Sequence, residues 1–166
     1  MSSFKNDKKD KFLASIPQCS LDSEIDLLTC RCKFNFAYFE KQAAGQSFNE
    51  WPHDKLHKLL DKLKDYSQQP LKYWMNQNIG KSGRVLSIYG AFPTKSGFAY
   101  PNHVPHQALW GRFRLEWADR LVGFVVPNSY HGKAHPVTGE RYDCNTFYVV
   151  FLDADHKFYL SAKEGK

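Results

Sequence analysis

The 166-residue sequence lacks the features that define several large classes of protein. No stretch approaches the roughly 20 consecutive apolar residues that a transmembrane helix requires. It contains no internal repeat, no low-complexity tract, no phosphate-binding glycine-rich loop, no nucleophile elbow and no dinucleotide-binding fingerprint. These absences argue against a membrane-spanning protein, against nucleotide-dependent chemistry and against acyl hydrolysis.

Cysteine is also scarce, and the four cysteines are Cys19, Cys30, Cys32 and Cys144. One residue between Cys30 and Cys32 is too few for half of a zinc knuckle, and Cys144 is too distant for a compact disulfide framework. Residues 1–10 are polar and lysine-rich, without the apolar segment of a secretory leader. We therefore expect a cytoplasmic protein with reduced, mostly buried thiols.

Histidine is more frequent, with seven residues, but no metal-binding pattern is complete. His53 and His57 lie one helical turn apart and lack the glutamate beside the first histidine that a metalloprotease helix carries. The other histidine pairs, in expected loops, have no third ligand in place. We expect no metal site and no cofactor.

The sequence is rich in aromatic residues and positive charge. Aromatic residues make up 16%, and 23 Lys and Arg against 17 Asp and Glu give a net charge of +6. Nucleic-acid-binding proteins use both properties, one for stacking on bases and one for attracting phosphates. A well-packed core under a mildly basic surface has the same composition, so both interpretations stay open.

Hydrophobic periodicity predicts a disordered basic tail at residues 1–20 and one α+β domain over residues 21–166. The leucine stripe Leu56, Leu59, Leu60 and Leu63 predicts an amphipathic helix at residues 49–66. A capping pattern predicts a short helix near residues 20–28. Strands are predicted at residues 32–39, 84–89, 109–117, 120–126, 146–152 and 157–160. We expect a twisted, mainly antiparallel sheet with one or two helices on a face, and insertions at 76–107 and 127–143.

A tight turn at residues 118–119 would pair the two predicted strands of a hairpin. This register places Phe113, Leu115, Trp117, Val122 and Phe124 on the core face. Arg112, Arg114 and Glu116 then lie on the opposite face, with Gly123 across from Arg114, and Arg120 starts the next strand. Guanidinium groups bind phosphate with two hydrogen bonds, and a carboxylate among them can take a proton. An ordinary exposed ladder of arginine and glutamate gives the same pattern.

The segment after the apolar strand at 146–152 carries groups suited to acid–base chemistry. His156 stands between Asp155 and Lys157, with Tyr159 close behind. Cleavage of RNA needs one group to remove the 2′-hydroxyl proton, one to protonate the leaving oxygen and cations to hold the phosphate. The alternative is a turn capped by aspartates with a surface histidine.

The carboxyl-terminal half resembles RelE/YoeB-type toxins, which are small bacterial mRNA endonucleases. The similar residues are Trp110 to Leu115, a turn, and Arg120-Leu121-Val122-Gly123-Phe124. The order of the upstream strand, the lysine-rich helix and Gln69-Pro70-Leu71-Lys72 is similar as well. Gln69 stands where some members have a catalytic glutamate, and Glu116 is a substitute for it.

The resemblance implies a RelE-like fold and a metal-independent, ribosome-associated endoribonuclease from a toxin–antitoxin or defence module. Its catalytic residues would be Arg120, His156, Tyr159 and Glu116, and its RNA-binding residues would be Arg112, Arg114, Lys72 and Lys157. The partners would be RNA, the ribosome and an antitoxin protein. The alternative is a non-catalytic basic module that binds nucleic acid or a protein through the same face.

Overall fold

The fold is built on a five-stranded sheet with the order β1-β7-β6-β5-β4. The computed structural model describes residues 6–16, 21–22, 27–81 and 83–160. The strands are β1 Lys33–Asn35, β4 Leu86–Gly90, β5 Leu109–Arg114, β6 Arg120–Val125 and β7 Thr146–Asp153. All neighbours are antiparallel except β1, which runs parallel to β7. The predicted α+β class with a mainly antiparallel sheet is confirmed.

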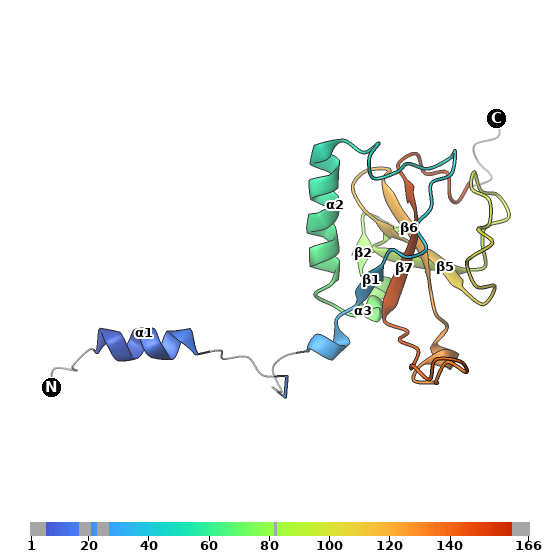
Figure 1. Ribbon diagram of the computed structural model, residues 1–166. Coiled ribbons are helices and arrows are strands. Elements are labelled where there is room, and N and C mark those ends of the chain that lie inside the picture. The colour runs from blue at the N-terminus through green and yellow to red at the C-terminus, as the bar shows by residue number, and fades with distance from the viewer. Residues whose placement is uncertain (1–5, 17–20, 23–26, 82, 161–166) are drawn as a thin grey trace.

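Helices and a small hairpin surround this sheet (Figure 1). The helices are α1 Asp7–Ser15, α2 His53–Tyr66 and α3 Leu71–Asn76, with short 3-10 turns at Leu28–Cys30 and Asn128–Tyr130. The hairpin pairs β2 Asn78–Ile79 with β3 Gly83–Arg84. Among the described residues no helix is long and apolar enough to cross a membrane.

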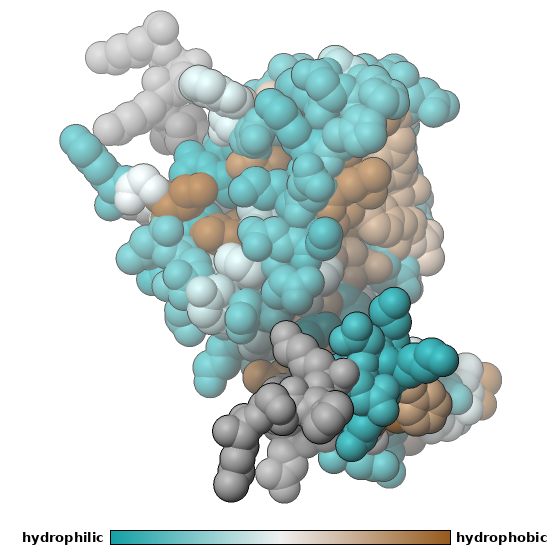
Figure 2. Space-filling model, turned by 90° about the vertical axis from the view of Figure 1, so that its left-hand side faces the viewer, coloured by the Kyte–Doolittle hydropathy of each residue, from teal (hydrophilic) through white to brown (hydrophobic). Residues whose placement is uncertain are grey.

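Helix α2 packs across one face of the sheet, as the leucine stripe predicts. Leu59 and Tyr66 are buried, and Leu56 and Leu63 pack beside them against the first core cluster, which includes Phe113 and Phe147 of the sheet. Leu60 does not belong to this contact, because its side chain is 62% exposed. The outer surface over α2 is mostly hydrophilic, with isolated apolar residues (Figure 2).

A second core cluster covers the opposite face without any helix. Loop residues Phe98, Val104 and Phe158 pack there on sheet residues that include Trp110 and Phe151. The predicted strand at 157–160 is wrong, because this segment is irregular and serves as part of the cover. It is held by two backbone hydrogen bonds to the 91–107 loop, from Gly97 N to Lys157 O and from Leu160 N to Lys95 O.

The apolar run at residues 146–152 forms strand β7, which is covered on both faces. Phe147 and Val149 belong to the first core cluster, whereas Val150 and Phe151 belong to the second. A strand that is buried on both faces has no alternating polar residues, and the continuous apolar run at 146–152 therefore correctly indicated such a strand.

The predicted register of the β5–β6 hairpin is wrong. The strands are joined by the five-residue loop 115–119, in which Leu115 N donates to Asp119 O and Trp117 has a φ of 49°. The pairing is Phe113 with Leu121 and Gly111 with Gly123. Since the shift from the predicted pairing is an odd number of residues, Val122 and Phe124 face away from Phe113.

Trp117, predicted in the core, is 92% exposed at the tip of this loop. The loop is longer than a two-residue turn because Asp119 turns inward. Its carboxylate lies 2.9 Å from Lys55 Nζ on α2 and is nearly buried. Trp117 is left outside as a result.

The amino-terminal elements differ from the predicted ones. Residues 7–15 form α1, where a disordered tail was expected, because Asn6 Oδ1 accepts from Lys9 N at the helix start. The predicted strand at 32–39 shortens to β1. Most of the predicted helix at 20–28 lies outside the described residues.

The predicted insertions contribute to the fold in different ways. Segment 76–107 supplies the β2–β3 hairpin and the edge strand β4, and segment 127–143 is an irregular loop with one isolated bridge between Ala134 and Arg141. Of the described cysteines, Cys30, Cys32 and Cys144 are free, and only Cys32 is buried. With one buried thiol among the three described, the prediction of mostly buried thiols is wrong.

Candidate functional site

Three arginines share one face of the β5–β6 hairpin. Arg114 pairs directly with Arg120, and Arg112 lies two residues before Arg114 on the same strand. Side chains two residues apart point to the same side of a strand. The predicted register had put Arg120 on the opposite face from Arg112 and Arg114, and the observed pairing brings all three to one face.

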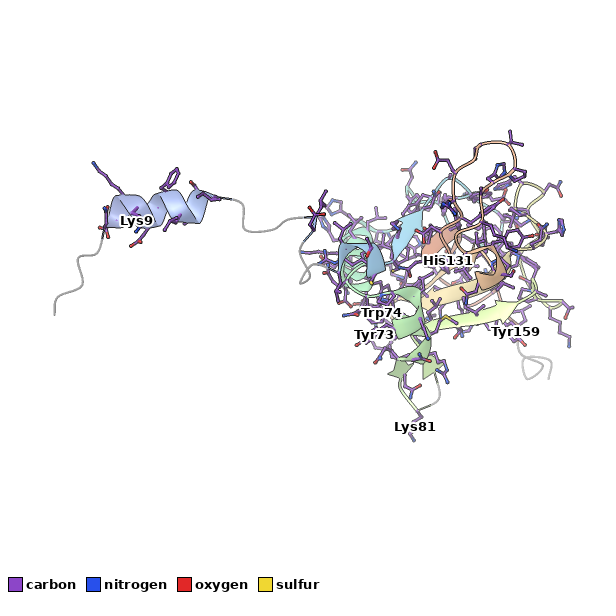
Figure 3. The ribbon with its side chains drawn as sticks, turned by 90° about the horizontal axis from the view of Figure 1, so that it is seen from below. Lys9, Tyr73, Trp74, Lys81, His131 and Tyr159 are labelled. Carbon is purple, nitrogen blue, oxygen red and sulfur yellow. The ribbon has the colours of Figure 1, made fainter. Side chains whose placement is uncertain are left out.

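This row borders an open groove of about 590 Å³ between the sheet and the β2–β3 hairpin. Its lining residues are Ile79, Gly80, Lys81, Gly83, Arg84, Ser87, Tyr89, Arg112 and Arg114, which we call the basic groove. Figure 3 shows Lys81 at the outer tip of the hairpin. Four of the nine lining residues are cationic and none is acidic. A concave surface of one charge attracts anions, and groups of this kind bind phosphate.

Close backbone approach by β3 shapes this groove. A Cβ atom on Gly83 would lie 2.5 Å from the Nη1 atom of Arg114. The absence of a side chain at Gly83 therefore lets the guanidinium of Arg114 lie against the hairpin.

Arg112 connects the groove to His156. Its Nε atom donates a hydrogen bond to the Tyr89 hydroxyl, and its guanidinium lies 5.9 Å from the centre of the Tyr89 ring. The Nη1 atom lies 3.4 Å from Nε2 of His156. Because a guanidinium only donates, this contact requires an unprotonated Nε2.

His156 is held in place by the turn that follows β7. Its φ of 62° is in the left-handed region, which few residues other than glycine adopt, although asparagine, aspartate and histidine do so more often than the rest. Asp153, which is 1% exposed, stabilises this turn by accepting hydrogen bonds from Lys157 N and Phe158 N. The same carboxylate accepts from Asp155 N, so it fixes the backbone on both sides of the histidine.

The surroundings of His156 favour its neutral form. Burial is the main cause that lowers its pKa from the usual value of 6.5, and the charges of Arg112 and Arg120 lower it further. A neutral imidazole beside a guanidinium can accept a proton from a substrate hydroxyl.

Tyr159 adds a second aromatic ring beside Tyr89, which lines the basic groove. Its ring stacks on Tyr89 with 4.9 Å between the ring centres and 17° between the planes. Tyr159 is 47% exposed, so one part of its ring stays open to solvent. An exposed ring beside cations is suited to stacking on a base.

Arg120, the expected catalytic arginine, lies below this surface rather than in the groove. Its side chain is 2% exposed, and Nη1 donates to the carbonyl oxygens of Trp117 and Asp119. Burial lowers its pKa to about 10, and the charges of Arg112 and Arg114 act in the same direction. Arg120 therefore places a positive charge behind the groove and does not line it.

The other expected residues do not line the basic groove: His156 and Tyr159 adjoin it through Arg112 and Tyr89, and three more have other partners. Glu116 pairs with Lys58 of α2 at 3.0 Å, because the loop after β5 turns toward that helix. Lys72 is on α3 and lines a different groove. Lys157 forms an ion pair with Asp155 at 2.9 Å, adjacent to His156 in the chain.

The sequence predicted only Arg112 and Arg114 among the lining residues, and it missed the four others with polar side chains, namely Lys81, Arg84, Ser87 and Tyr89. Ser87 and Tyr89 are two residues apart in the predicted strand at 84–89, so the sequence indicated that they share one face of that strand. Nothing in the pattern showed that this strand would pair with the arginine strand.

The described residues contain no group of three or more histidine, cysteine, aspartate or glutamate side chains that could hold a metal ion. Comparisons with protein-family models, with curated proteins and with solved structures found no match to this chain. The geometry of the basic groove therefore carries the functional interpretation.

Proposed function

We propose that this protein is a metal-independent RNA endonuclease of the RelE-like kind, with the basic groove as its RNA-binding site. The observation that carries the proposal is the position of His156 beside Arg112, at the edge of a groove whose charged lining residues are all positive. The lowered pKa of His156 favours the neutral form that a proton acceptor needs. A toxin role, with the ribosome and an antitoxin as partners, follows from the resemblance and belongs to the same proposal.

Binding rests on the cations of the groove. Lys81 and Arg84 come from the β2–β3 hairpin, and Arg112 and Arg114 come from β5, so an RNA strand would have cations on both sides. Tyr159 would stack on a base next to the bound phosphates. Single-stranded RNA fits this arrangement because its bases are free to stack.

Cleavage would use the 2′-hydroxyl of the RNA itself. When a phosphate binds Arg112, Nη1 of that arginine turns to the phosphate oxygen and leaves Nε2 of His156 free. Nε2 then takes the 2′-hydroxyl proton, the 2′-oxygen forms a bond to phosphorus, and the bond from phosphorus to the 5′-oxygen breaks. The 5′-oxygen takes a proton from the Tyr89 hydroxyl, and a 2′,3′-cyclic phosphate remains. The proton on His156 then passes to water and a proton from water restores Tyr89, so both groups return to their starting state.

The arginines would stabilise the charge that grows on the phosphate during this step. Arg112 touches the phosphate, whereas buried Arg120 acts through its charge and by fixing the backbone of the 115–119 loop. Removal of one donor of this type from a transition state typically costs about 10² to 10³ in rate.

The test uses a fluorescent single-stranded RNA, alone and with translating ribosomes, in the presence of EDTA. Arg112→Ala and His156→Asn each remove one part of the proposed site, and asparagine tolerates the left-handed backbone at position 156. Lys64→Ala, on the exposed side of α2, is the charge-matched control for Arg112→Ala. We expect cleavage by the native protein and by Lys64→Ala, and a loss of at least about 10² in rate for both site variants.

Loss of cleavage on adding EDTA, or full activity of both site variants, contradicts the proposal. The basic groove also supports the second candidate function, a non-catalytic RNA-binding module, because it contains no carboxylate and Glu116 lies elsewhere. RNA binding that Arg112→Ala weakens, without cleavage under either condition, would identify that module.

A further inference from the structure

The tip of the β5–β6 hairpin holds a tryptophan in an unfavourable position. Trp117 is 92% exposed, which leaves both faces of its indole ring open to solvent. Its φ of 49° lies in the left-handed region, where a bulky side chain is strained. Glycine or asparagine would relieve this strain and would place no apolar ring in water. Packing therefore gives no reason for an indole at this position.

The 115–119 loop holds this tryptophan in a fixed place. Its two end residues are joined by the hydrogen bond from Leu115 N to Asp119 O. The guanidinium of buried Arg120 donates to Trp117 O at 2.8 Å. Both carboxylates of the loop form ion pairs with lysines of α2. Because the loop is already ordered, binding to the exposed ring costs little conformational entropy.

The charged groups around the loop favour an anionic ligand. The carboxylates of Glu116 and Asp119 lie 3.0 Å and 2.9 Å from lysine nitrogens of α2, so the negative charges of the loop are balanced. Arg114 directly precedes the loop and lines the basic groove, and Arg120 directly follows it. An exposed aromatic ring beside cations is the combination that binds single-stranded nucleic acid.

Trp117 stands near the Arg114 end of the basic groove. It follows Arg114 by three residues, so their Cα atoms are at most about 11 Å apart. Near the other end of the groove, Tyr159 stacks on Tyr89, whose hydroxyl accepts a hydrogen bond from Arg112. The row of cations therefore has an exposed aromatic ring near each end.

A single exposed ring suits a base better than it suits a protein or a lipid surface. Leu115, the other large apolar residue of the 115–119 loop, is only 7% exposed. Protein interfaces and membrane anchors gather several apolar side chains in one patch. One open ring beside cations offers stacking area for one base, whatever the identity of that base.

We propose that Trp117 is a second base-stacking site, which binds the RNA strand beyond the Arg114 end of the basic groove. This inference rests on the proposed function, because it takes single-stranded RNA as the ligand of that groove. One base of the bound RNA stacks on Tyr159, and another base further along the strand stacks on Trp117. Because the second contact is separate from the reacting groups, it strengthens binding before and during cleavage alike and favours longer single strands.

Fluorescence-anisotropy titrations with a labelled single-stranded RNA test this assignment. Trp117→Asn removes the ring and suits the left-handed backbone, whereas Trp117→Tyr keeps an aromatic ring. Val137→Asn is the matched control, because Val137 is an apolar residue that is 86% exposed in a different loop. We expect Trp117→Asn to weaken binding at least about fivefold, Trp117→Tyr to restore most of the affinity and the control to bind like the native protein.

A set of RNAs with an abasic nucleotide at each position in turn locates the stacked base. At one position the abasic RNA should bind the native protein more weakly than intact RNA does. The same RNA should bind Trp117→Asn as well as intact RNA does, because that variant has already lost the contact. In cleavage assays Trp117→Asn should raise KM and leave kcat unchanged. Its free energy of unfolding should not fall, because the substitution relieves backbone strain.

The outcomes separate this inference from the proposed function. RNA binding that Trp117→Asn leaves unchanged contradicts the stacking site, while cleavage by the native protein still supports the proposed function. Binding that depends on Trp117 without any cleavage supports the stacking site and contradicts only the catalytic part of the proposal. A native protein that binds no RNA contradicts both. If it instead binds vesicles of phosphatidylcholine and phosphatidylserine, and Trp117→Asn abolishes that binding, the ring belongs to a lipid-binding surface.

Discussion

His156 is the residue on which the chemistry depends. It occupies a strained backbone position between the buried Asp153 and Lys157, and Arg112 contacts its Nε2 atom. A side chain held in the left-handed region persists only where its surroundings fix it, and such positions concentrate at functional sites. The left-handed backbone at His156 lowers the stability of the turn after β7, and it fixes the orientation of the imidazole.

The pH dependence of cleavage should report the surroundings of His156. Because burial and two arginines lower its pKa below 6.5, the imidazole stays neutral and able to accept a proton as the pH falls through 6.5. We expect the rate to hold through that pH and to decline only below it. A pH–rate profile of the native protein checks this, and a decline centred above 6.5 would contradict the assigned role.

The same shift predicts the direction in which stability changes with pH. Below 6.5 the unfolded chain binds a proton at this histidine before the folded chain does, so the free energy of unfolding falls with falling pH until the folded pKa is reached. In the His156→Asn variant, the free energy of unfolding should depend less steeply on pH between 6.5 and the folded pKa, because the titrating group is gone. Urea unfolding of both proteins at several pH values measures it, and equal slopes would show that the histidine is not shifted.

At the scale of elements, strands β5, β6 and β7 position the arginines and the histidine through close backbone packing. A Cβ atom on Gly123 of β6 would lie 2.0 Å from Tyr148 O and 2.8 Å from the ring of Phe147. The neighbouring atom is backbone, which cannot move aside. The sheet around the site therefore has no room at this position.

Gly123→Ala should lower the free energy of unfolding by at least about 2 kcal/mol, because the added methyl group overpacks the core. Chemical denaturation measures this change. A decrease in the free energy of unfolding of less than about 0.5 kcal/mol would show that β6 is not tightly packed at Gly123.

Phe151→Ala tests the burial of β7 on the face away from α2. Phe151 is 1% exposed and packs on Phe98 with 4.5 Å between the ring centres. We expect a loss of roughly 3–5 kcal/mol in the free energy of unfolding, from lost burial and the cavity left behind. Leu60→Ala, on the exposed side of α2, is the control and should change it by less than about 0.5 kcal/mol. Similar losses for both variants would contradict this packing.

The sequence predicted the elements with strong patterns and missed the pairings between distant ones. The apolar run of β7 and the leucines of α2 are local signals, and both elements were identified. The hairpin register failed because the inward position of Asp119, which pairs with Lys55, lengthens the loop. Lys81 and Arg84 were missed because their position depends on the pairing of β4 with β5.

At the scale of the whole molecule, the chain carries a net charge of +6. Four cations line one groove and a fifth, Arg120, is buried behind it. Such a groove binds a phosphate backbone by releasing counterions, so its affinity falls as salt rises.

Removal of two of these cations should flatten that salt dependence. Lys81→Ala/Arg84→Ala deletes the hairpin side of the groove, and the slope of log affinity against log salt should fall by between about one and two. Filter binding with single-stranded RNA at several salt concentrations measures it. Lys64→Ala/Lys133→Ala removes two exposed charges elsewhere and should keep the slope, whereas an equal change in both pairs would show that the groove is not the binding surface.

The chemistry of the RNA ends tests the central claim most directly. Attack by the 2′-oxygen leaves a 2′,3′-cyclic phosphate or the 3′-phosphate formed from it, whereas attack by water that releases the 3′-oxygen leaves a 3′-hydroxyl. Mass spectrometry of fragments made in EDTA distinguishes these ends, with a matched RNA that has a 2′-deoxy sugar at the cleaved position as the control. We expect cyclic or 3′-phosphate ends and no cleavage of the deoxy control, and 3′-hydroxyl ends or equal cleavage of both substrates would contradict a site built on Arg112 and His156.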